Sequence, residues 1–400
     1  YSQSDCGKVH ITVSSLQDTY LELNWITDCG TLDIVPDYIL LSSKNIQERN
    51  EDPNMIVQIN FSDYPSGYYK TKVRFGEPWL PGNWEYDENT TRADAGPHCF
   101  PYWIASVTDS LIVDSRCLAI QPTWMSDNSK AIGSLKIGSM FIPGTHNSGS
   151  FKGVPFFIQN YVLNQDRSIW AQLVFGIRYL DFRIGYYERD GFYINHDLVR
   201  IIKVQPVLRE IRKFLELAPK EIIVIDFHRF PFPKNFSNDL HKKFISMVYE
   251  ELGAFALPTK DLQWGKGPSL NEIWGKNKNL IIGYADKQTV SDNPWLWHPL
   301  QQYWGNTKRV SELKAFLGRS ITDHRVTINP LWALMAELTP QPIDIVFRTN
   351  NLRKLADDVN RELTKWFRDE WSRQVNIVAT DYFLGNDLIN VAIRANILNG

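Results

Sequence analysis

Several features that would identify other protein classes are missing from this chain. No apolar run approaches the roughly 20 residues that a membrane-spanning helix needs. A formal net charge of only -2 over 400 residues excludes a broad electrostatic attraction to nucleic acid. The chain has no internal repeat and no low-complexity tract, which excludes a solenoid. None of its four cysteines shows metal-binding spacing such as C-x-x-C. We therefore expect a globular protein with no transmembrane segment and no nucleic-acid partner.

The few cysteines indicate an oxidising compartment. All four lie in the first third of the chain, and paired cysteines clustered in one module are typical of disulfides in secreted proteins. Three pairings are possible, and the two short loops favour Cys6–Cys29 and Cys99–Cys117. A first residue of Tyr instead of Met is expected of a processed, secreted chain or of a trimmed sequence. Three N-x-S/T sequons agree with secretion and predict glycosylation at Asn60, Asn89 and Asn235.

Residues 1–125 have the pattern of an all-β domain. Two segments, Val9–Val13 and Tyr20–Trp25, alternate apolar and polar residues. Turn clusters such as Pro81-Gly82-Asn83 separate short strands, which favours a sandwich-like domain that carries the disulfides. The other expected strands are 38–41, 56–61, 68–75, 104–107 and 117–120.

Residues 131–400 alternate strands with helices, which is typical of an α/β barrel. We predict a distorted (β/α) TIM-type barrel, joined to the first domain by a polar linker at 125–130. The expected strands are 135–141, 178–183, 192–195, 221–227, 280–284, 344–347 and 375–380. The expected helices are 169–175, 205–217, 239–252, 311–317, 352–371 and 387–398.

Polar residues end at least five of these otherwise apolar strands. Because side chains alternate faces along a strand, a polar residue at the carboxyl end can share the face of the apolar residues before it. In a barrel these ends converge at one mouth, where active sites are built. The residues concerned are His146 on the first strand, Asp181 and Arg183 on the second, His196 on the third, Asp226 and His228 on the fourth, and Asp381 on the last.

Three segments together resemble a known family. Gly144-Thr145-His146-Asn147-Ser148, Ile177–Arg183 and Ile194-Asn195-His196 are similar to the X-domain of phosphatidylinositol-specific phospholipases C. The closer match is to the small single-domain group, the bacterial enzymes and the animal X-domain-containing proteins. The resemblance covers roughly residues 131–400 and includes the closing Ala379-Thr380-Asp381-Tyr382-Phe383, but not the N-terminal β domain.

The resemblance implies a role for each strand-end residue. His146 matches the general base that deprotonates the inositol 2-hydroxyl, and His196 matches the general acid that protonates the leaving diacylglycerol. Arg183 matches the arginine that neutralises the pentacoordinate phosphorane. Asp381 matches the carboxylate that orients the base, and Asp181 is expected to position Arg183 and the attacking hydroxyl.

Two positions define the branch of the family. The calcium-dependent relatives carry a carboxylate at the position of Arg183, and an arginine repels a cation; we therefore expect no metal and no cofactor. The bacterial form carries an aspartate at the position of Asn147, which pairs with the acid histidine. A neutral amide raises the pKa of that histidine less than a carboxylate does, so low or altered activity stays open.

The remaining predicted site residues concern the substrate and the membrane. We expect Asn147, Asp226, His228 and Tyr284 to contact the headgroup. The segment that contains Phe151, Phe156 and Phe157 is either an apolar rim that dips into a bilayer or the start of a buried helix. The predicted partner is phosphatidylinositol or a glycosyl-phosphatidylinositol anchor at a membrane surface, bound by a peripheral, secreted monomer.

Three functions are compatible with this reading. The first is a phosphodiesterase that cleaves phosphatidylinositol or its glycosylated anchor to diacylglycerol and cyclic inositol phosphate. The second is a phospholipase D-like lyase, which shares the barrel and the paired histidines but normally needs an acidic metal triad. The third is a lipid- or glycan-binding protein with a weakened site, which Asn147 supports. Metal-free turnover of phosphatidylinositol separates the three.

Overall fold

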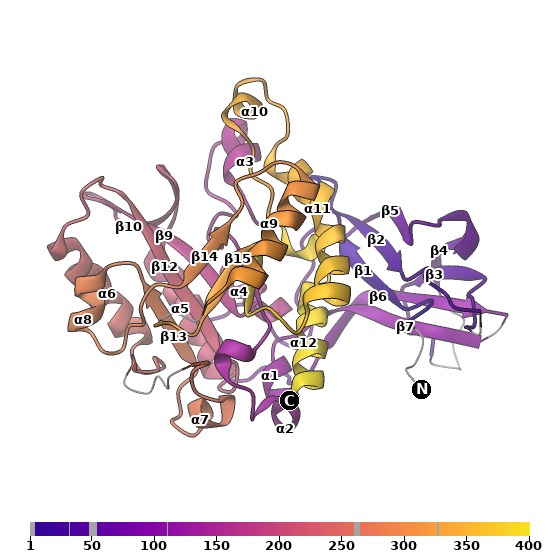
Figure 1. The fold of residues 1–400 in the computed structure, drawn as a ribbon, viewed down its shortest axis with the longest axis horizontal. Coiled ribbons are helices and arrows are strands. Elements are labelled where there is room, and N and C mark those ends of the chain that lie inside the picture. Colours follow the sequence, from indigo (N-terminus) through magenta and orange to yellow (C-terminus); the bar gives the residue numbers. More distant parts are fainter. Residues whose placement is uncertain (1–4, 32, 48–53, 110, 260–264, 326–327) are drawn as a thin grey trace. The chain divides into compact units, whose positions relative to one another are not determined.

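The computed structural model describes residues 5–31, 33–47, 54–109, 111–259, 265–325 and 328–400 (Figure 1). The chain divides into two compact units. The first comprises Tyr1–Glu85, Pro97–Ile120 and Leu384–Asp387, and the second comprises Tyr86–Gly96, Gln121–Phe383 and Leu388–Gly400.

The first unit contains two antiparallel sheets. Its strands are short and carry β-branched and aromatic residues, as strands usually do. One sheet has the order β1-β2-β5 and the other β4-β3-β6-β7. The all-β content agrees with the prediction, whereas a sandwich arrangement of the two sheets stays a prediction. The strands are β1 (Val9–Val13), β2 (Tyr20–Trp25), β3 (Tyr38–Ser42), β4 (Met55–Asn60), β5 (Tyr68–Arg74), β6 (His98–Thr108) and β7 (Leu111–Ile120).

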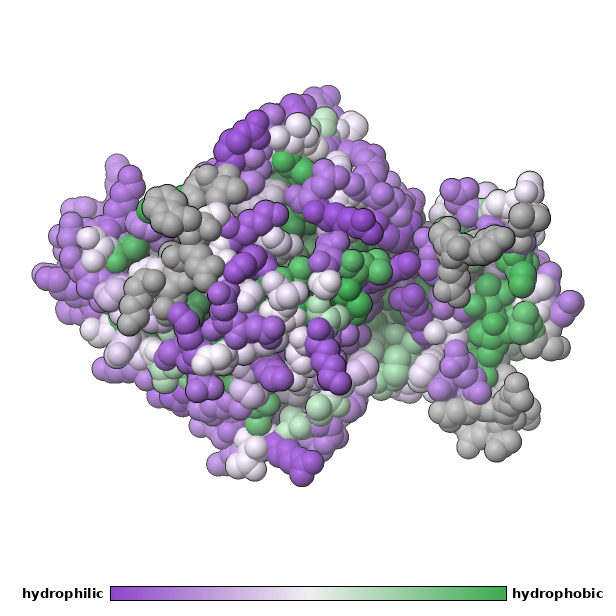
Figure 2. Space-filling model, turned by 60° about the horizontal axis from the view of Figure 1, so that its bottom comes forward, coloured by the Kyte–Doolittle hydropathy of each residue, from purple (hydrophilic) through white to green (hydrophobic). Residues whose placement is uncertain are grey.

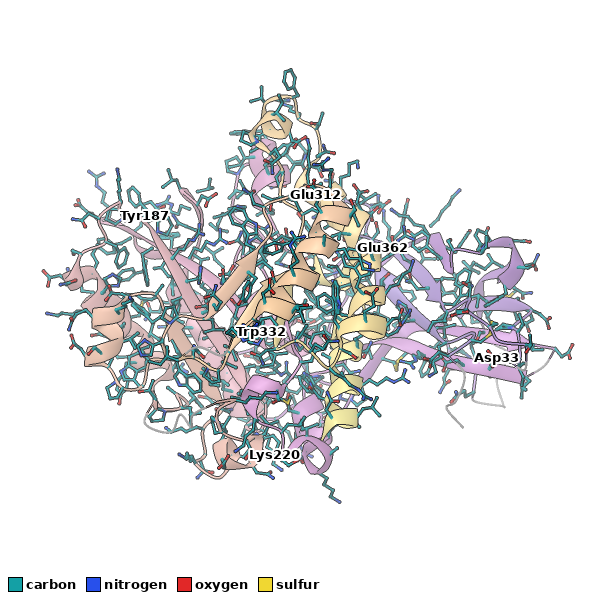
Figure 3. All side chains as sticks on the ribbon, viewed as in Figure 1. Asp33, Tyr187, Lys220, Glu312, Trp332 and Glu362 are labelled. Carbon is teal, nitrogen blue, oxygen red and sulfur yellow. A yellow bond between two sulfur atoms is a disulfide. The ribbon has the colours of Figure 1, made fainter. Side chains whose placement is uncertain are left out.

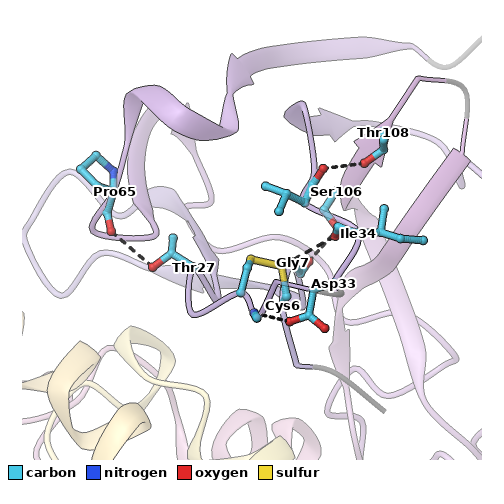
Figure 4. The surroundings of a disulfide bond; sticks show 11 residues. Cys6, Gly7, Thr27, Asp33, Ile34, Pro65, Ser106 and Thr108 are labelled. Atoms are coloured by element: carbon cyan, nitrogen blue, oxygen red, sulfur yellow. Dashed lines mark hydrogen bonds between the residues drawn. A yellow bond between two sulfur atoms is a disulfide. The ribbon is translucent and has the colours of Figure 1, made fainter.

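Both favoured disulfides are present, Cys6–Cys29 and Cys99–Cys117. Figure 4 shows how polar contacts surround the first one. The Asp33 carboxylate accepts a hydrogen bond from the Gly30 backbone N–H at 2.6 Å, inside the loop that follows Cys29. Ser106 Oγ donates to the Gly7 carbonyl oxygen at 2.6 Å. The disulfide therefore fastens the chain at Cys6, next to Gly7, which the Ser106 side chain of β6 also holds.

The second unit is built on a mixed sheet that is mainly parallel. Parallel pairing runs through β14, β15, β16, β8, β9, β12 and β13 in that order, and β10 and β11 extend β9 as an antiparallel hairpin. The strands are β8 (Ile142–Thr145), β9 (Tyr179–Tyr187), β10 (Gly191–His196), β11 (Val199–Lys203), β12 (Ile223–Phe232), β13 (Leu280–Tyr284), β14 (Gln301–Trp304), β15 (Trp332–Met335) and β16 (Ile377–Thr380).

The strand pairing gives a coarser architecture than the predicted TIM-type barrel. Within the described residues, no ladder joins the two end strands β13 and β14; a single bridge links Gly283 to Trp297, a few residues before β14 begins. The observed fold is therefore a mixed α/β fold with a parallel sheet, and barrel closure goes beyond what the pairing shows.

Side chains on successive residues of this sheet enter two different cores. Ala333, Met335, Ile377 and Ala379 belong to one buried cluster, which we call the inner core. Leu334 and Val378 belong to a second cluster, the outer core, together with residues of the helices α9 (Val310–Asp323), α11 (Leu352–Trp366) and α12 (Leu388–Asn399). Burial on both faces is expected for parallel strands and explains their nearly continuous apolar runs. Figure 3 marks Trp332, where β15 begins.

The helices of the second unit connect or cover these strands (Figure 1). Within the described residues, no helix combines the length and apolarity that crossing a bilayer requires. On the face shown in Figure 2, hydrophilic residues predominate and apolar residues form separate small groups. The helices are α1 (Trp124–Asp127), α2 (Ser129–Ile132), α3 (Phe156–Val162), α4 (Ile169–Phe175), α5 (Val204–Leu217), α6 (Asn238–Leu252), α7 (Leu270–Trp274), α8 (Lys287–Asp292), α9 (Val310–Asp323), α10 (Pro342–Val346), α11 (Leu352–Trp366) and α12 (Leu388–Asn399).

Three sequence predictions about local structure were wrong. The expected linker at 125–130 forms parts of α1 and α2, because Trp124, Met125 and Ile132 are buried and hold it against the core. The expected strand at 344–347 lies in and directly after α10, whose first turn carries a proline. The expected strand at 135–141 contains a 3-10 turn, and the strand proper starts at Ile142.

The third predicted strand, 192–195, is a strand but not a parallel one. The chain turns back after β9 through Asp190 and Gly191, and Gly191 has a φ of 85°, which favours a tight hairpin. Strand β10 then pairs antiparallel to β9, with Ile194 opposite Ile184. Continuing this register brings His196 beside the middle of β9, where Asp181 and Arg183 lie.

One buried ion pair holds the base of the second unit together. Arg178 and Glu221 are both fully buried, and Arg178 donates to the Glu221 carboxylate from Nε at 3.0 Å and from Nη2 at 2.6 Å. The same guanidinium donates to the carbonyl oxygens of Leu173 and Pro122. Arg178 thus joins the start of β9 to the segment before β12 and to the entry of the unit.

Replacing Arg178 should destabilise the fold strongly. We expect Arg178→Met to lower the free energy of unfolding by about 3–5 kcal/mol, because it leaves the Glu221 carboxylate buried without its partner. The double variant R178M/E221L removes both charges and should recover a large part of this loss. Chemical denaturation of the three proteins measures it. Equal losses in the single and double variants would show that the uncompensated carboxylate is not the cause.

Candidate active site

His146 and Asp381 are brought together by the pairing of β8 with β16. Thr145 lies opposite Thr380 in this parallel pair, so the next residues of both strands stand at the same height. The His146 backbone N–H donates to the Thr380 carbonyl oxygen at 3.1 Å, and His146 Nδ1 lies 2.9 Å from Asp381 Oδ1. An imidazole whose Nδ1–H faces a carboxylate has its second nitrogen directed away from it, toward the cavity.

The Asp381 carboxylate has a second partner that fixes it. Asn164 Nδ2 donates to Asp381 Oδ2 at 2.9 Å, and Asn164 Oδ1 accepts from Asn147 Nδ2 at 3.2 Å. Asn147 has a φ of 43°, in the left-handed region that asparagine tolerates better than most residues. Its side chain therefore belongs to the network that orients Asp381. Asn147 Oδ1 is buried and has no hydrogen-bond partner among the described residues.

Arg183 lies on the cavity side of His146. Its Nη2 is 3.2 Å from His146 Nε2 and 3.7 Å from Asp181 Oδ2, and its Nη1 is 3.8 Å from Asp197 Oδ1. A guanidinium can only donate hydrogen bonds. The Nε2 lone pair of a neutral imidazole can therefore accept a hydrogen bond from Arg183, whereas a protonated Nε2 cannot.

Asp181 is fully buried beneath Arg183. Its carboxylate accepts from the Asn147 backbone N–H at 3.0 Å and from Gln302 Nε2 at 3.3 Å. Burial alone would raise the pKa of Asp181. The charges of Arg183, His146 and His228 and the backbone donor outweigh burial, so the pKa lies below its usual value. Asp181 is therefore a permanent negative charge that anchors Arg183.

His196 enters the same cavity from β10. Its Nδ1 lies 2.5 Å from the Val162 carbonyl oxygen, which makes Nδ1 the donor and leaves Nε2 for the cavity. The Asp197 carboxylate is 4.0 Å from Nε2. Burial lowers the pKa of His196 below its usual value, and the weak contact with Asp197 does not reverse this. The ligand-free ring is therefore neutral at neutral pH.

Asp226 and His228 lie beneath the cavity floor and at its side. Asp226 is fully buried and accepts from Tyr179 Oη and Gln302 Nε2, both at 3.1 Å, and its Oδ2 is 3.4 Å from His228 Nδ1. Burial would lower the pKa of His228, but Asp226 and Asp181 raise it above its usual value. This layer of polar groups supports Asp181 and therefore Arg183.

Two adjoining cavities surround these residues. The first, of about 210 Å³, is lined by both histidines, Arg183, Asn147 and Asp381, and also by apolar residues such as Leu338 and Ile345. The second, of about 440 Å³, is lined by Arg183, His228 and Arg229 among others. Arg183, Asp197 and Arg229 line both, so the guanidinium of Arg183 faces each space.

Like Asp226, Tyr284 is a predicted headgroup contact that is absent from the described lining of both cavities. It is fully buried, it hydrogen-bonds through its hydroxyl to His241 Nδ1 at 2.7 Å, and its ring packs against Phe227 and Phe230. It does not appear among the described residues that line either cavity. Its place at the end of β13 is as predicted, but an aromatic core takes up its side chain.

The predicted rim phenylalanines are exposed, with the exception of Phe151, which is half-buried. Phe156 and Phe157 in α3 are 77% and 79% exposed, so the alternative of a buried helix start is wrong for these two. Tyr161 Oη in α3 donates to the carbonyl oxygens of Asp344 and Thr349 around α10. We call the exposed apolar side chains of these two helices the apolar tip: Phe156, Phe157, Ile343, Ile345, Val346 and Phe347.

Sequence reasoning missed Glu337, Gln302 and Asn164. Glu337 follows β15 and lines the smaller cavity with His146 and Asp381. The signal for it was present, because the apolar run Trp332–Met335 is closed by an acid, as β16 is closed by Asp381. Gln302 and Asn164 carried no comparable signal, since both lie in short segments without a clear period.

The carboxylates around His146 change its protonation. Burial and Arg183 lower the pKa of His146, but the charges of Glu337 and Asp381 and the hydrogen bond to Asp381 raise it more, to about 9. Burial in turn raises the pKa of Glu337 to about 8. Glu337 raises the pKa of His146, and His146 lowers the pKa of Glu337.

Known proteins with a similar sequence share one description. No family model matches the chain. Human PI-PLC X domain-containing protein 1 is 22% identical over 313 residues, which cover 70% of this chain and 94% of that protein. Mouse PI-PLC X domain-containing protein 3 is 27% identical over 306 residues, which cover 68% and 92%.

Solved structures agree on the fold. Phosphatidylinositol-specific phospholipase C from Listeria monocytogenes superposes with a TM-score of 0.51 at 18% identity over 70% of this chain and 98% of that one. The F249X mutant of the Staphylococcus aureus enzyme gives 0.52 at 16% identity over 68% and 97%. The second unit therefore has a mixed α/β fold similar to these enzymes.

The protonation of His146 can be tested directly. Asp381→Asn should lower the pKa of His146 from about 9, because it removes the carboxylate that is hydrogen-bonded to Nδ1 and favours the imidazolium. NMR titration of the imidazole measures it. Asp197→Asn is the matched control, since Asp197 lies at the same site but contacts Arg183 and His196. Equal shifts in both variants would mean that the Asp381 contact has no special effect.

Proposed function

We propose that this chain, which belongs to the PI-PLC X-domain family, is a phosphodiesterase that cleaves phosphatidylinositol or its glycosylated anchor. One observation supports this most: His146, His196 and Arg183 line one cavity, and each histidine has its Nδ1 tied to an acceptor. Two imidazoles and a guanidinium in one cavity suit a base, an acid and a positive charge for one phosphodiester.

In the first step His146 acts as the general base. Its Nε2 lone pair takes the proton from the inositol 2-hydroxyl, while the hydroxyl oxygen attacks phosphorus. Asp381 stabilises the imidazolium that forms, through the hydrogen bond at Nδ1. Arg183 lies against Nε2 in the ligand-free site, so it competes with the inositol 2-hydroxyl for the same lone pair. The substrate phosphate must therefore draw Arg183 away from Nε2.

Arg183 then neutralises the phosphorane. A guanidinium presents several donors in a fixed plane, which suits the equatorial oxygens of a phosphate. Asp181 holds it from below, and Asp181 is in turn held by Gln302 and the Asn147 backbone. Because a guanidinium stands where a cation would bind, we propose that the reaction needs no metal ion.

In the last step His196 protonates the leaving diacylglycerol oxygen through Nε2. The products are diacylglycerol and cyclic inositol phosphate, and the proton on His146 is available for slow opening of the cycle by water. The pKa of His196 is lowered in the ligand-free site. A phosphate anion beside the ring raises it, because an opposite charge favours the imidazolium. Substrate binding therefore favours the protonated form of His196, which the last step needs.

The apolar tip supports action at a lipid surface. Large exposed apolar patches often mark a surface that binds a partner or a membrane. The six exposed apolar side chains of the tip lie on α3, on α10 and directly after α10, and one of them, Ile345, also lines the smaller cavity. We propose that the tip enters the interfacial region of a bilayer while the phosphodiester enters the cavity.

We also propose that the protein is secreted and glycosylated. Two disulfides in the first unit suit an oxidising compartment. The sequon asparagines Asn60, Asn89 and Asn235 are all exposed, as an oligosaccharide acceptor must be. A monomeric state also stays a prediction.

A catalytically weakened lipid- or glycan-binding protein is the second candidate. One feature favours it: the carboxylates around His146 raise its pKa to about 9 and burial lowers the pKa of His196, so the ligand-free site favours a protonated base and a neutral acid, the reverse of what the reaction needs. Only the minority form with both groups correctly protonated would react. Binding of phosphatidylinositol without turnover at any pH would favour this candidate.

The catalytic assignment is tested by removing each imidazole. His146→Ala and His196→Ala should each reduce phosphatidylinositol hydrolysis by roughly 10²–10⁴-fold, the usual loss when a general base or acid is removed. The assay is run with a chelator and the headgroup product is identified. A folded variant that keeps the parental rate would show that its histidine is neither acid nor base. Strict calcium dependence of the parent would overturn the metal-free reaction.

The membrane role of the apolar tip is tested separately. The double variant F156S/F157S should lower the ratio of vesicle hydrolysis to hydrolysis of a soluble short-chain substrate at least tenfold, since each buried phenylalanine contributes about 1.5–3 kcal/mol. Leu398→Ser is the matched control, because Leu398 is an exposed apolar residue of α12 outside the tip. An unchanged ratio in the double variant would exclude α3 from the lipid contact.

A further inference from the structure

Glu337 reaches the active site by strand alternation. Ala333 and Met335 of β15 point into the inner core, whereas Leu334, Ala336 and Leu338 point into the outer one. The Ala336 backbone N–H donates to the Ala379 carbonyl oxygen at 2.8 Å, so the chain stays extended beside β16 beyond the end of β15. Glu337 therefore shares the inner face with Met335, at the level of His146 and Asp381.

The Glu337 carboxyl group is buried without a partner. The residue is only 2% exposed, and among the described residues neither carboxyl oxygen has a hydrogen-bond partner. Leaving a buried polar group unpaired is costly, and a carboxylate more so than a neutral group. Burial raises the pKa of Glu337 to about 8, which keeps the group mostly protonated at neutral pH and reduces the cost without removing it.

Two other buried acids near His146 and Arg183 already have hydrogen-bond donors for both carboxyl oxygens. The Asp381 oxygens contact His146 Nδ1 and Asn164 Nδ2. The Asp181 oxygens contact the Asn147 backbone N–H and Gln302 Nε2. Of the three buried acids Asp181, Asp381 and Glu337, Glu337 is thus the one whose two carboxyl oxygens are both left without a donor from the described part of the chain. Asn147 Oδ1 adds a second unused acceptor in the same lining.

We propose that Glu337 hydrogen-bonds the ring hydroxyl next to the attacking hydroxyl and so selects a vicinal polyol as the headgroup. This rests on the proposed function, which places the attacking oxygen at His146 Nε2. The neighbouring hydroxyl is separated from that oxygen by only two ring carbons, and Glu337 lines the same cavity as His146. A headgroup with one hydroxyl, or with a quaternary amine, leaves Glu337 unpaired and is rejected for that reason.

Thermal stability distinguishes a ligand-binding role of Glu337 from a structural one. Glu337→Gln and Glu337→Leu remove an unpaired buried acid, so neither should lower the thermal unfolding midpoint, and the leucine variant should raise it. Glu362→Gln, on α11 (Figure 3), is the matched surface control, because Glu362 pairs with Lys365 at 3.1 Å away from the cavity. A clear loss of stability in both Glu337 variants, with unchanged ligand binding, would assign Glu337 to the fold.

Ligand binding gives the decisive measurement. Calorimetry is used to measure binding of free myo-inositol and of each monodeoxy-inositol to the parent, E337Q, E337L and E362Q. We expect E337L to bind myo-inositol about tenfold more weakly than the parent, the usual effect of one hydrogen bond of this kind. One deoxy analogue should bind the parent about tenfold more weakly and lose nothing further in E337L, since the partner is already missing.

The possible failures can be told apart. If the parent hydrolyses phosphatidylinositol and every analogue loses the same factor in the parent and in E337L, the Glu337 contact is wrong and the proposed function stands. If the parent neither hydrolyses phosphatidylinositol nor binds myo-inositol, both proposals are wrong. In active proteins the E337L loss should appear mainly in KM, whereas loss of the base lowers kcat.

Discussion

The parallel pairing of β8 with β16 is the constraint on which the candidate site depends. It joins the first parallel strand of the second unit to the last one, and it sets His146 and Asp381 together although they are 235 residues apart in sequence. Neither strand has more than four residues, so burial on both faces must hold them. The chemistry of the site therefore depends on apolar packing at Ile142, Ile377 and Ala379, which lie beneath the polar ends.

The sequence predicted the parts of the site that follow a strand pattern. His146 and Asp381 directly follow β8 and β16, whereas Asp181 and Arg183 lie inside β9, which runs on to Tyr187 and does not end at Arg183 as predicted. The structure nevertheless brings these four residues together. It also predicted β10, but not that β10 returns along β9, because the direction of a strand depends on the turn before it. Tyr284 shows the limit of the pattern: a polar strand end is not a cavity residue when aromatic neighbours fill the space.

One buried carboxyl group near His146 and Arg183 is left without a donor from the described part of the chain. Three buried acids, Asp181, Asp381 and Glu337, lie around one guanidinium and one imidazole, and the exposed Asp197 is a fourth acid at the guanidinium. Two of them have donors from the chain, and these donors come from loops and strand ends that sequence patterns do not reveal, such as Asn164 and Gln302. The third acid, Glu337, reduces the free-energy cost of its burial by staying mostly protonated at neutral pH. An enzyme site commonly keeps such unpaired groups where the substrate supplies the partner.

The smaller cavity is lined by both polar and apolar residues, which suits the two ends of the proposed phospholipid substrate. His146, His196 and Arg183 form the polar part, and Leu338 and Ile345 contribute to the apolar part, Ile345 being also a member of the apolar tip. A phosphodiester that reached Arg183 would leave its acyl chains on the side of α10. In water those chains would stay exposed, whereas at a bilayer they remain in lipid while the headgroup enters the cavity. The geometry therefore favours a substrate that never leaves the membrane surface completely.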